Sequence, residues 1–245
     1  MSDDVVWARS EPACAVREAL LSAVFRPLIA LYARREVSGA KHLDTVEGPV
    51  VFVANHCSHM DTPLMLRALP WRWRHRTGTA AAADYFYKRR LMAMAVSLAF
   101  NTVPVDRTSG RGQPDAVSVL DRLLEEDWSI LVFAEGTRSR TGAVGPLQSG
   151  AAVLAARHGV PIVPIYIGGT YAAMPPGRRW MRRRPDGRRR DVRVAFGPPI
   201  PPRPLEERRE VMEQVRLFFE RQGATTTPNR RVAGKRQQEV TTATG

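Results

Sequence analysis

The stretch "PVVFVANHCSHMDTPLMLRAL", residues 49–69, indicates the fold class. Its first apolar run, residues 49–55, has the length and the β-branched content of a buried strand. Its second apolar run, residues 63–69, has a helical pattern and follows a Thr-Pro pair. An asparagine, two histidines and an aspartate lie between the two runs. A polar cluster is therefore expected where a buried strand leads into a helix.

Strand-like and helical stretches alternate along the rest of the chain. Five further runs are typical of strands, at residues 77–84, 101–107, 129–136, 160–169 and 191–197. Helical patterns lie between and after them, at residues 86–99, 113–126, 148–158 and 205–221. This order predicts an α/β fold in which helices flank a central, mostly parallel sheet. Pro104 predicts that its strand ends early or lies at an edge, because proline cannot donate to a ladder.

Polar residues follow three of the predicted strands. In sheets of this class, functional sites lie beyond the carboxyl ends of the strands. The clusters at these ends are Asn55-His56, Asp106-Arg107 and Glu135-Gly136-Thr137-Arg138. We therefore expect all three clusters to face one cleft.

The chain is expected to have three parts. Residues 1–37 are predicted to form amphipathic, membrane-associating helices, and residues 38–221 an α/β domain. Residues 222–245 are polar and rich in threonine, which predicts a disordered tail.

The apolar stretch at residues 15–35 is interrupted by Arg17, Glu18, Arg26 and Pro27. These interruptions argue against a helix that spans a bilayer. They predict an N-terminal helix that lies in the membrane interface, is kinked near Pro27 and is closed by Arg34 and Arg35. The alternative is an amphipathic helix that packs on the protein's own domain.

The 245 residues carry a formal charge of +13, which favours an anionic partner. Nucleic acid, an anionic membrane surface and a phosphorylated substrate all fit that charge. No zinc pattern or nucleic-acid recognition motif is visible, so nucleic acid is not expected. The two cysteines, Cys14 and Cys57, give no disulfide framework and suit a reducing cytosol. No secretory signal is apparent.

His56 and Asp61 form the candidate catalytic pair. On a continuous helix, residues five apart are separated by roughly 140°, so the two side chains meet only if the chain turns between them. Thr62 can cap a helix whose first residue is Pro63, which would place Asp61 at the positive end of that helix. Asp61 would then fix the tautomer of His56, and the other ring nitrogen would accept a proton from a substrate hydroxyl.

Three other interpretations of this pair remain open. A histidine at a strand end is often structural, and an aspartate before Thr-Pro is often a helix cap. His56, His59 and Asp61 also suggest a metal site, but no further cluster of ligands completes it. Cys57 suggests a thiol nucleophile, but adjacent residues on an extended backbone point in opposite directions.

The second candidate cluster is "FAEGTRS", residues 133–139. Gly136 permits close backbone approach, Thr137 adds a hydroxyl, and the guanidinium of Arg138 matches phosphate oxygens. Glu135 is expected to orient an arginine or the loop. Arg107 ends another strand, and two arginines that converge on one cleft would hold a phosphate monoester.

Four motifs resemble those of the glycerolipid acyltransferases. "NHCSHMD" resembles the family's N-H-x-x-x-x-D motif, and "VPVDR", "FAEGTRS" and "VPIVPI" resemble its other three blocks in the same order. The similarity covers about residues 38–205 and is strongest to bacterial 1-acylglycerol-3-phosphate acyltransferases. It identifies residues 38–221 as an acyltransferase domain.

The resemblance implies a reaction and a set of roles. The free sn-2 hydroxyl of a lysophospholipid attacks the thioester of acyl-CoA or acyl-carrier protein, with 1-acylglycerol-3-phosphate giving phosphatidate. His56 is the implied general base and Asp61 its orienting partner. The implied glycerol-phosphate site is formed by Arg107, Glu135, Gly136, Thr137 and Arg138. Neither a metal, a cofactor nor a covalent acyl-enzyme is implied.

The chain departs from the family pattern at two places. Ala134 stands where the third block usually has proline, and Gln148-Ser149 stands where many members have a Phe-Lys-type pair. Another lysolipid or hydroxyl compound is therefore an alternative acceptor. The residues also leave open a thioesterase-like hydrolase and a non-enzymatic basic module that binds membrane or nucleic acid.

An enzyme of this kind is expected at the cytoplasmic face of the cell membrane, as a peripheral or monotopic protein. An anionic membrane surface is its expected partner, and acyl-carrier protein is a candidate partner. The basic segment 178–193, the helix at 15–35 and the stretch at 85–100 are the candidate membrane contacts.

Overall fold

The computed structural model describes residues 6–82, 90–105 and 115–227. These residues contain a seven-stranded sheet in the order β1-β7-β6-β2-β5-β3-β4. Its strands are β1 (Ala33–Ser38), β2 (Val51–Ala54), β3 (Thr77–Ala82), β4 (Thr102–Val105), β5 (Ser129–Phe133), β6 (Ile162–Gly168) and β7 (Arg190–Phe196). All neighbouring strands run parallel except β6 and β7. The predicted α/β fold with a mostly parallel sheet is confirmed.

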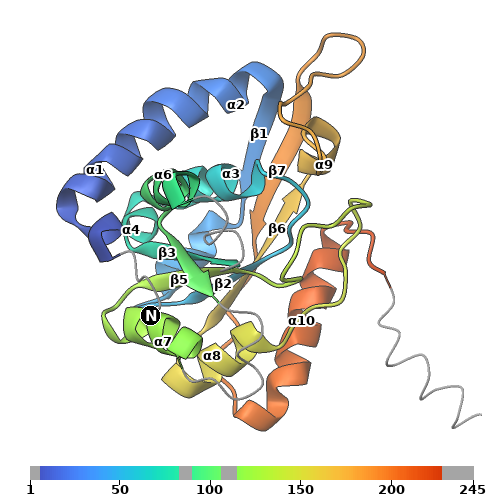
Figure 1. The fold of residues 1–245 in the computed structure, drawn as a ribbon. Helices are drawn as coiled ribbons and strands as arrows, with labels where there is room; N and C mark the ends of the chain where they lie inside the picture. Colours follow the sequence, from blue (N-terminus) through green and yellow to red (C-terminus); the bar gives the residue numbers. More distant parts are fainter. Residues whose placement is uncertain (1–5, 83–89, 106–114, 228–245) are drawn as a thin grey trace, which may run out of the picture.

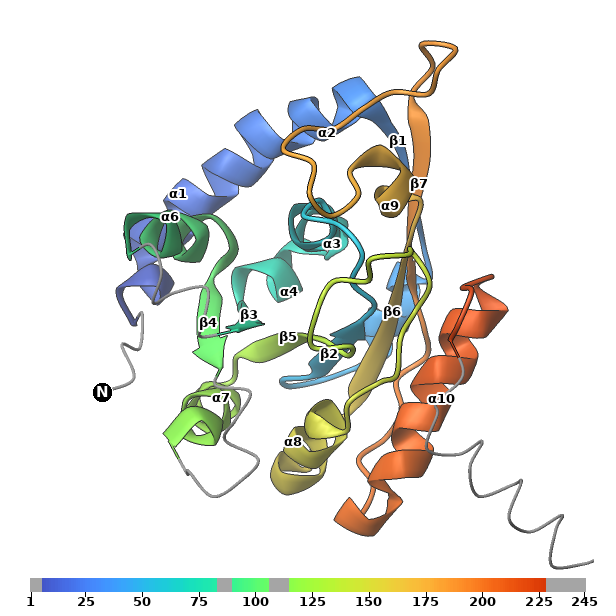
Figure 2. The ribbon, with the colours of Figure 1, turned by 45° about the vertical axis from the view of Figure 1, so that its right-hand side comes forward.

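Helices cover both faces of the sheet (Figures 1 and 2). On one face lie α1 (Glu11–Ala19), α2 (Arg26–Tyr32), α3 (Asp61–Ala68), α4 (Trp71–His75) and α6 (Arg90–Phe100). On the other lie α7 (Asp115–Glu125), α8 (Gly150–His158) and α10 (Arg208–Arg221). The short α9 (Thr170–Ala173) follows β6, and the 3₁₀ turns are Val6–Arg9, Ala40–Thr45 and Leu205–Glu207.

Strand β2 shows how the two layers share the sheet. Val51 and Val53 belong to the core cluster beneath α7, α8 and α10, whereas Phe52 and Ala54 belong to the cluster beneath α3 and α4. All four are 0% exposed. Side chains alternate between the faces of a strand, and a strand buried on both faces is a continuous apolar run. This is why the run at 49–55 is recognisable in the sequence.

The edge strand β1 was not predicted. Its sequence "ARREVS" exposes five of its six residues, so it lacks the apolar signal of the central strands. It pairs with β7 along its whole length, from Ala33 opposite Arg190 to Ser38 opposite Ala195. At the opposite edge lies β4, which contains Pro104, as the sequence predicts.

One continuous helix runs from Glu11 to Tyr32, because α1 and α2 are joined by a π-helical segment, Leu20–Phe25. The irregularity expected near Pro27 therefore takes the form of π-type hydrogen bonding just before it. Proline has no N–H and its ring clashes with the carbonyl four residues earlier, which disfavours a regular α-helical ladder there. The expectation that Arg34 and Arg35 close the helix is wrong, since both belong to β1.

The N-terminal helix packs on the protein's own domain along one side. Leu21 and Ile29 are buried in the core cluster beneath it, while Val16, Val24 and Leu31 are exposed. Over the described residues, none of the helices combines the length and hydrophobicity that a bilayer crossing requires.

The residues after α10 also contact the domain. The N–H of Val144 donates to the carbonyl of Thr225, and the N–H of Thr227 donates to the carbonyl of Val144. Residues 222–227, at the start of the segment predicted to be a tail, therefore pack beside the loop that follows β5. Residues 228–245 lie outside the described residues.

The sheet order determines which strand ends meet. β2 lies between β5 and β6, and all three strands are parallel. Their last residues, Ala54, Phe133 and Gly168, therefore lie at the same end of the sheet, its carboxyl end. β4 is two strands away from β5, a separation of roughly 10 Å at the usual strand spacing. Because β7 runs antiparallel to β6, the first residues of β7 and of its parallel neighbour β1 also lie at this carboxyl end of the sheet.

Candidate active site

His56 and Asp61 are hydrogen-bonded across a tight turn. The distance between Nδ1 of His56 and Oδ2 of Asp61 is 2.8 Å. The same carboxylate oxygen accepts the backbone N–H groups of Cys57 at 2.7 Å and Ser58 at 2.8 Å. The turn between β2 and α3 thus folds around one carboxylate oxygen, and Asp61 is 0% exposed.

The start of α3 differs from the prediction. Asp61 is the first residue of the helix, with Met60 before it, so the expected cap at Thr62 and start at Pro63 are wrong. The carboxylate satisfies donors of the preceding turn and lies at the positive end of the helix dipole, which stabilises its charge. Its other oxygen, Oδ1, is buried and accepts no hydrogen bond from the described residues.

The ring of His56 stacks on Phe133, the last residue of β5. The two ring centroids are 3.9 Å apart, with an angle of 17° between the planes. Asp61 holds the Nδ1 side, while no described residue hydrogen-bonds Nε2. The side chain is 18% exposed, so the ring is fixed on two sides but still open to solvent. Sequence reasoning missed Phe133, because the stacking depends on β5 lying beside β2.

Asn55 ties the end of β2 to β6. Its Nδ2 donates to the carbonyl of Ile167 at 2.9 Å, and its Oδ1 accepts the N–H of Ile167 at 2.7 Å. The strand pairing itself ends at Ala54 and Ile165. The Asn55 amide therefore continues the hydrogen bonding of the sheet where the backbone begins to turn. The next residue, His56, then lies at the carboxyl end of the sheet.

Glu135 holds the loop after β5 against the turn after β2. Its Oε1 accepts the N–H of His56 at 3.0 Å, and its Oε2 accepts the N–H of Gly145 at 2.8 Å. The N–H of Ser139 donates to the carbonyl of His56 at 2.7 Å, which fastens the two segments again. Burial raises the pKa of Glu135, and the two backbone hydrogen bonds oppose that rise. Of the two roles expected for Glu135, the structure shows the orientation of the loop.

Gly136 adopts a φ of +69°, which favours glycine, and it donates to the carbonyl of Phe133 at 2.9 Å. A Cβ there would approach only the side chain of Gln148, at 3.9 Å. The backbone angle, rather than close approach, therefore requires the glycine. In the described part of the chain, the N–H groups of Thr137 and Arg138 donate no hydrogen bond.

Arg138 contacts the turn that carries the catalytic candidates. Its Nη1 donates to Nε2 of His59. Partial burial and then the charge of Arg138 lower the pKa of His59, which keeps that ring neutral and able to accept. Arg138, Thr137, Glu135 and Gln148 also line a surface pocket of about 340 Å³. The structure thus brings together every predicted site residue except Arg107, which lies outside the described residues.

Cys57 is not placed as a nucleophile. It is buried, and its Sγ lies 3.2 Å from Oγ1 of Thr170. Burial, followed by the charge of Asp61, raises the pKa of Cys57 to about 12, so the thiol stays protonated at neutral pH. Among the described residues, no three His, Cys, Asp or Glu side chains are arranged to hold a metal ion.

Comparisons with known proteins show which proteins this chain resembles. Curated relatives include the chloroplastic 1-acyl-sn-glycerol-3-phosphate acyltransferase BAT2 of Brassica napus, 31% identical over 168 residues, which are 68% of this chain and 45% of that protein. The human 1-acyl-sn-glycerol-3-phosphate acyltransferase alpha is 33% identical over 165 residues, with 63% of this chain and 55% of that protein covered. The chain thus spans about half the length of these relatives.

The fold also matches a solved structure. The crystal structure of the 1-acyl-sn-glycerophosphate acyltransferase PlsC from Thermotoga maritima superimposes with a TM-score of 0.63 and 24% sequence identity. The match covers 93% of this chain and 86% of that one, and it concerns the fold. The sequence model of the family described as Acyltransferase matches residues 34–168, which is more than half of the chain. The protein therefore belongs to the acyltransferase family.

Proposed function

We propose that this protein transfers a fatty acyl group from acyl-CoA or acyl-carrier protein to the free hydroxyl of a lysophospholipid, and that the acceptor is 1-acylglycerol-3-phosphate. One observation carries the proposal. The 2.8 Å hydrogen bond to buried Asp61 fixes the ring of His56 at the carboxyl end of the sheet, near the loop that carries Arg138, and no described residue hydrogen-bonds its Nε2. This is the geometry of a general base that awaits a substrate proton.

The proposed mechanism uses the two ring nitrogens of His56 for different tasks. Nδ1–H stays bonded to Asp61, which fixes the tautomer and stabilises the imidazolium. Nε2 takes the proton of the acceptor hydroxyl, and the oxygen of that hydroxyl attacks the carbonyl carbon of the thioester. The tetrahedral intermediate then expels the thiolate, which takes the proton from Nε2 and leaves as a thiol. An ester and a free thiol result, without an acyl-enzyme and without a metal ion.

The acceptor's phosphate is assigned to the loop after β5. Arg138 supplies a guanidinium, and the N–H groups of Thr137 and Arg138 are unbonded in the described part of the chain. Gly136 gives the loop the backbone angle that this arrangement needs. Arg107 is assigned to the same site from its sequence motif alone, because it lies outside the described residues. Glu135 supports the site through the loop, because both of its oxygens are occupied by backbone N–H groups.

The choice of lysophosphatidate rests on the relatives, several of which are named 1-acyl-sn-glycerol-3-phosphate acyltransferases. Gln148 lines the same pocket as Arg138. In many family members, a Phe-Lys-type pair stands in place of Gln148 and Ser149. A second anionic-lipid acceptor, such as lysophosphatidylglycerol, therefore remains the alternative substrate.

We also propose peripheral or monotopic binding to the cytoplasmic face of an anionic membrane. On α6, the side chains of Leu91, Met92 and Met94 are 84%, 46% and 43% exposed. This helix packs beside α1, whose Val16 is also exposed. The basic segment 178–193 adds cations, each of which contributes about 1 kcal/mol near an anionic surface. Acyl-carrier protein, which is itself anionic, is a compatible donor.

The test is thiol release from acyl-CoA with a panel of acceptors. Release is expected to depend on the acceptor and to be fastest with lysophosphatidate, with phosphatidate as the product. Acceptor-independent release would instead indicate a hydrolase. Salt-dependent DNA binding without any thiol release would favour the non-enzymatic basic module.

A further inference from the structure

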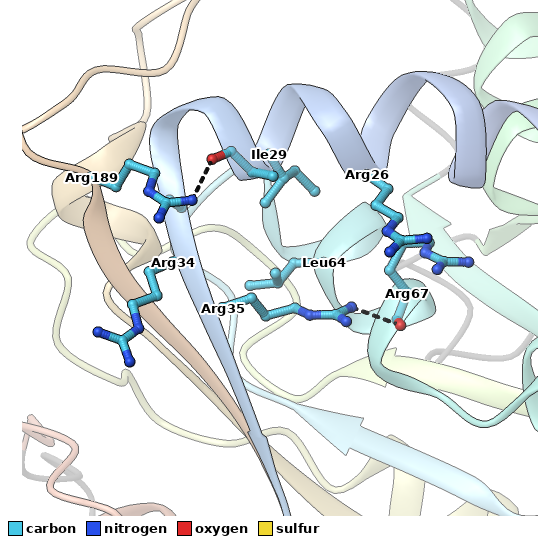
Figure 3. Close-up of a pocket in the computed structure, with 9 residues that line it drawn as sticks. Arg26, Ile29, Arg34, Arg35, Leu64, Arg67 and Arg189 are labelled. Atoms are coloured by element: carbon cyan, nitrogen blue, oxygen red, sulfur yellow. Dashed lines mark hydrogen bonds between the residues drawn. The ribbon is translucent and has the colours of Figure 1, made fainter.

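An arginine-lined pocket lies beneath α2, away from the loop that carries Arg138 (Figure 3). Its volume is about 300 Å³. α2 contributes Arg26 and Ile29, β1 contributes Arg35, and α3 contributes Leu64 and Arg67. In Figure 3, the guanidinium groups of Arg26 and Arg67 lie side by side and that of Arg35 points toward them, whereas that of Arg34 points away.

Among the described residues, Glu18 is the one acid that forms an ion pair with an arginine of this pocket. Glu18 is hydrogen-bonded to Arg67 at 3.3 Å and to Arg74 at 2.8 and 3.0 Å. Arg35 donates to the backbone carbonyl of Arg67 at 2.8 Å, and no described residue hydrogen-bonds the side chain of Arg26. Burial, followed by neighbouring guanidinium groups, lowers the pKa of Arg35 and Arg67. Crowded like charges of this kind are unfavourable unless an anion shares them.

The pocket is separate from the proposed acceptor site. The two lie near opposite ends of α3. Arg138 contacts His59, just before the helix begins, whereas Arg67 lies in its last turn. Asp61 and Arg67 are six positions apart, which corresponds to about 9 Å along the helix axis. One phosphate group cannot occupy both places.

The shape and lining of the pocket indicate the class of ligand. Its apolar wall is formed by Ile29 and Leu64, which are 6% and 0% exposed, and three of its five lining arginines have their guanidinium groups close together. A cavity of this size has the volume of about ten water molecules, which suits a group with as many heavy atoms, such as glycerol phosphate. The exposed Val24 and Leu31 on the outer side of the same helix adjoin the face that we assign to the membrane.

We infer that this pocket binds the glycerol phosphate group of an anionic membrane phospholipid that is not the acceptor. This inference rests on the membrane placement proposed above, but it does not require acyl transfer. Planar guanidinium groups would bind the phosphate oxygens in pairs, which a lysine cannot do. A lipid held here would keep the adjoining helix on the bilayer while the acceptor enters beside His56.

The test compares two charge-conserving variants, Arg26→Lys in the pocket and Arg188→Lys on the exposed basic segment 178–193, outside the pocket. Binding of the full-length protein is measured by co-sedimentation with phosphatidylcholine vesicles, with and without phosphatidylglycerol. Arg26→Lys is expected to weaken binding to the phosphatidylglycerol vesicles about fivefold, because charge-assisted bidentate hydrogen bonds are lost. Arg188→Lys is expected to bind like the wild type. Equal binding by both variants would overturn the inference in favour of diffuse charge attraction.

Two further measurements identify the ligand. Soluble glycerol 3-phosphate should displace the wild-type protein from vesicles more effectively than inorganic phosphate at equal ionic strength. Equal displacement would overturn the lipid assignment in favour of a free phosphate site. With the acceptor dispersed in detergent, Arg26→Lys should leave the KM unchanged, whereas a raised KM would make the pocket part of the acceptor site. Vesicle binding is measured without turnover, so failure of this inference is distinguishable from failure of the proposed acyl transfer.

Discussion

His56 and His158 each hydrogen-bond an aspartate, yet their surroundings differ. His158 ends α8 and binds Asp121 of α7 through Nε2 at 2.6 Å. Arg157 shares the same carboxylate, at 2.9 and 3.1 Å, and Asp121 is 18% exposed. α8 leads into β6, so this pair lies at the opposite edge of the sheet from His56. The guanidinium of Arg157 is a cation at a helix C-terminus, which is favourable, and together with His158 it fastens α8 to α7, so this pair is a stabilising contact.

In the His56 pair, the surrounding contacts fix the position of the imidazole ring. Its carboxylate is fully buried and held by two backbone N–H groups, and its ring is stacked on Phe133. Apart from His56, no described basic side chain binds that carboxylate. The comparison teaches that hydrogen bonding to an acid does not by itself make a histidine a base. His56 differs from His158 in two ways: it lies at the carboxyl end of the sheet, and no described residue hydrogen-bonds its Nε2.

The largest expected difference between the pairs is produced by removing each ring. His56→Ala should reduce acyl transfer by about a thousandfold, since a general base contributes typically 10²–10⁴-fold. His158→Ala should leave transfer within about twofold and lower the free energy of unfolding by up to about 1 kcal/mol. Thiol release and urea unfolding of both variants measure the two effects. Full activity of His56→Ala, in a folded protein, would end the proposed mechanism.

The aspartates provide a second comparison. Asp61→Asn preserves the shape but removes the charge that fixes the tautomer, so kcat should fall by about a hundredfold or more. Asp121→Asn should change kcat little. The measurement is kcat for both variants with saturating acceptor and donor. An equal, small loss in both would show that the two carboxylates have similar, structural roles.

Arg138→Ala tests the phosphate side of the site. Loss of a charge-assisted hydrogen bond should raise the KM for lysophosphatidate by about tenfold or more. With an uncharged alcohol as acceptor, KM should be unaffected. Arg209→Ala, on the exposed side of α10 and away from this pocket, is the control and should leave the KM unchanged. If Arg138→Ala leaves the KM for lysophosphatidate unchanged, Arg138 does not bind the phosphate.

The smallest expected effect is a pH dependence that arises from His59. Its pKa is lowered, so the ring is neutral at pH 7 and gains a proton only as the pH falls through that lowered value. A protonated His59 cannot accept from Arg138 and repels it, so KM should rise a few-fold below that pH. Lysophosphatidylglycerol is the suitable acceptor, because its phosphodiester does not titrate in this range.

His59→Gln supplies the control for this effect. Its side-chain oxygen can accept from Arg138 at every pH, so the rise of KM at low pH should disappear. The same rise in both proteins would assign the titration to another group.

The fold was largely predictable because its central strands are buried on both faces. β2, β5 and β6 are apolar runs bounded by polar residues, and each was predicted from that pattern. β1 escaped prediction because a solvent-exposed edge strand with two arginines has no such pattern. The direction of β7 depends on pairing between distant segments, which composition does not reveal.

The candidate site was predictable where it is local in sequence. The His56–Asp61 hydrogen bond follows from five residues and a turn, although the helix begins two residues earlier than predicted. The stacking of His56 on Phe133 joins positions 77 residues apart, and it depends on the order of strands in the sheet. The arginine-lined pocket likewise combines three separate segments, none of which is unusual alone.

The buried guanidinium of Arg17 has a practical consequence. It donates to backbone carbonyls of Ala8 and of Leu98, the latter at 3.0 Å, and thus fastens the first helix to α6. At its other end, that helix passes without a linker into a strand of the sheet. Deleting residues 6–32 to obtain a smaller, more easily handled protein would therefore uncover Leu64 and its neighbours. Protein prepared for crystallisation or assay should retain the whole segment.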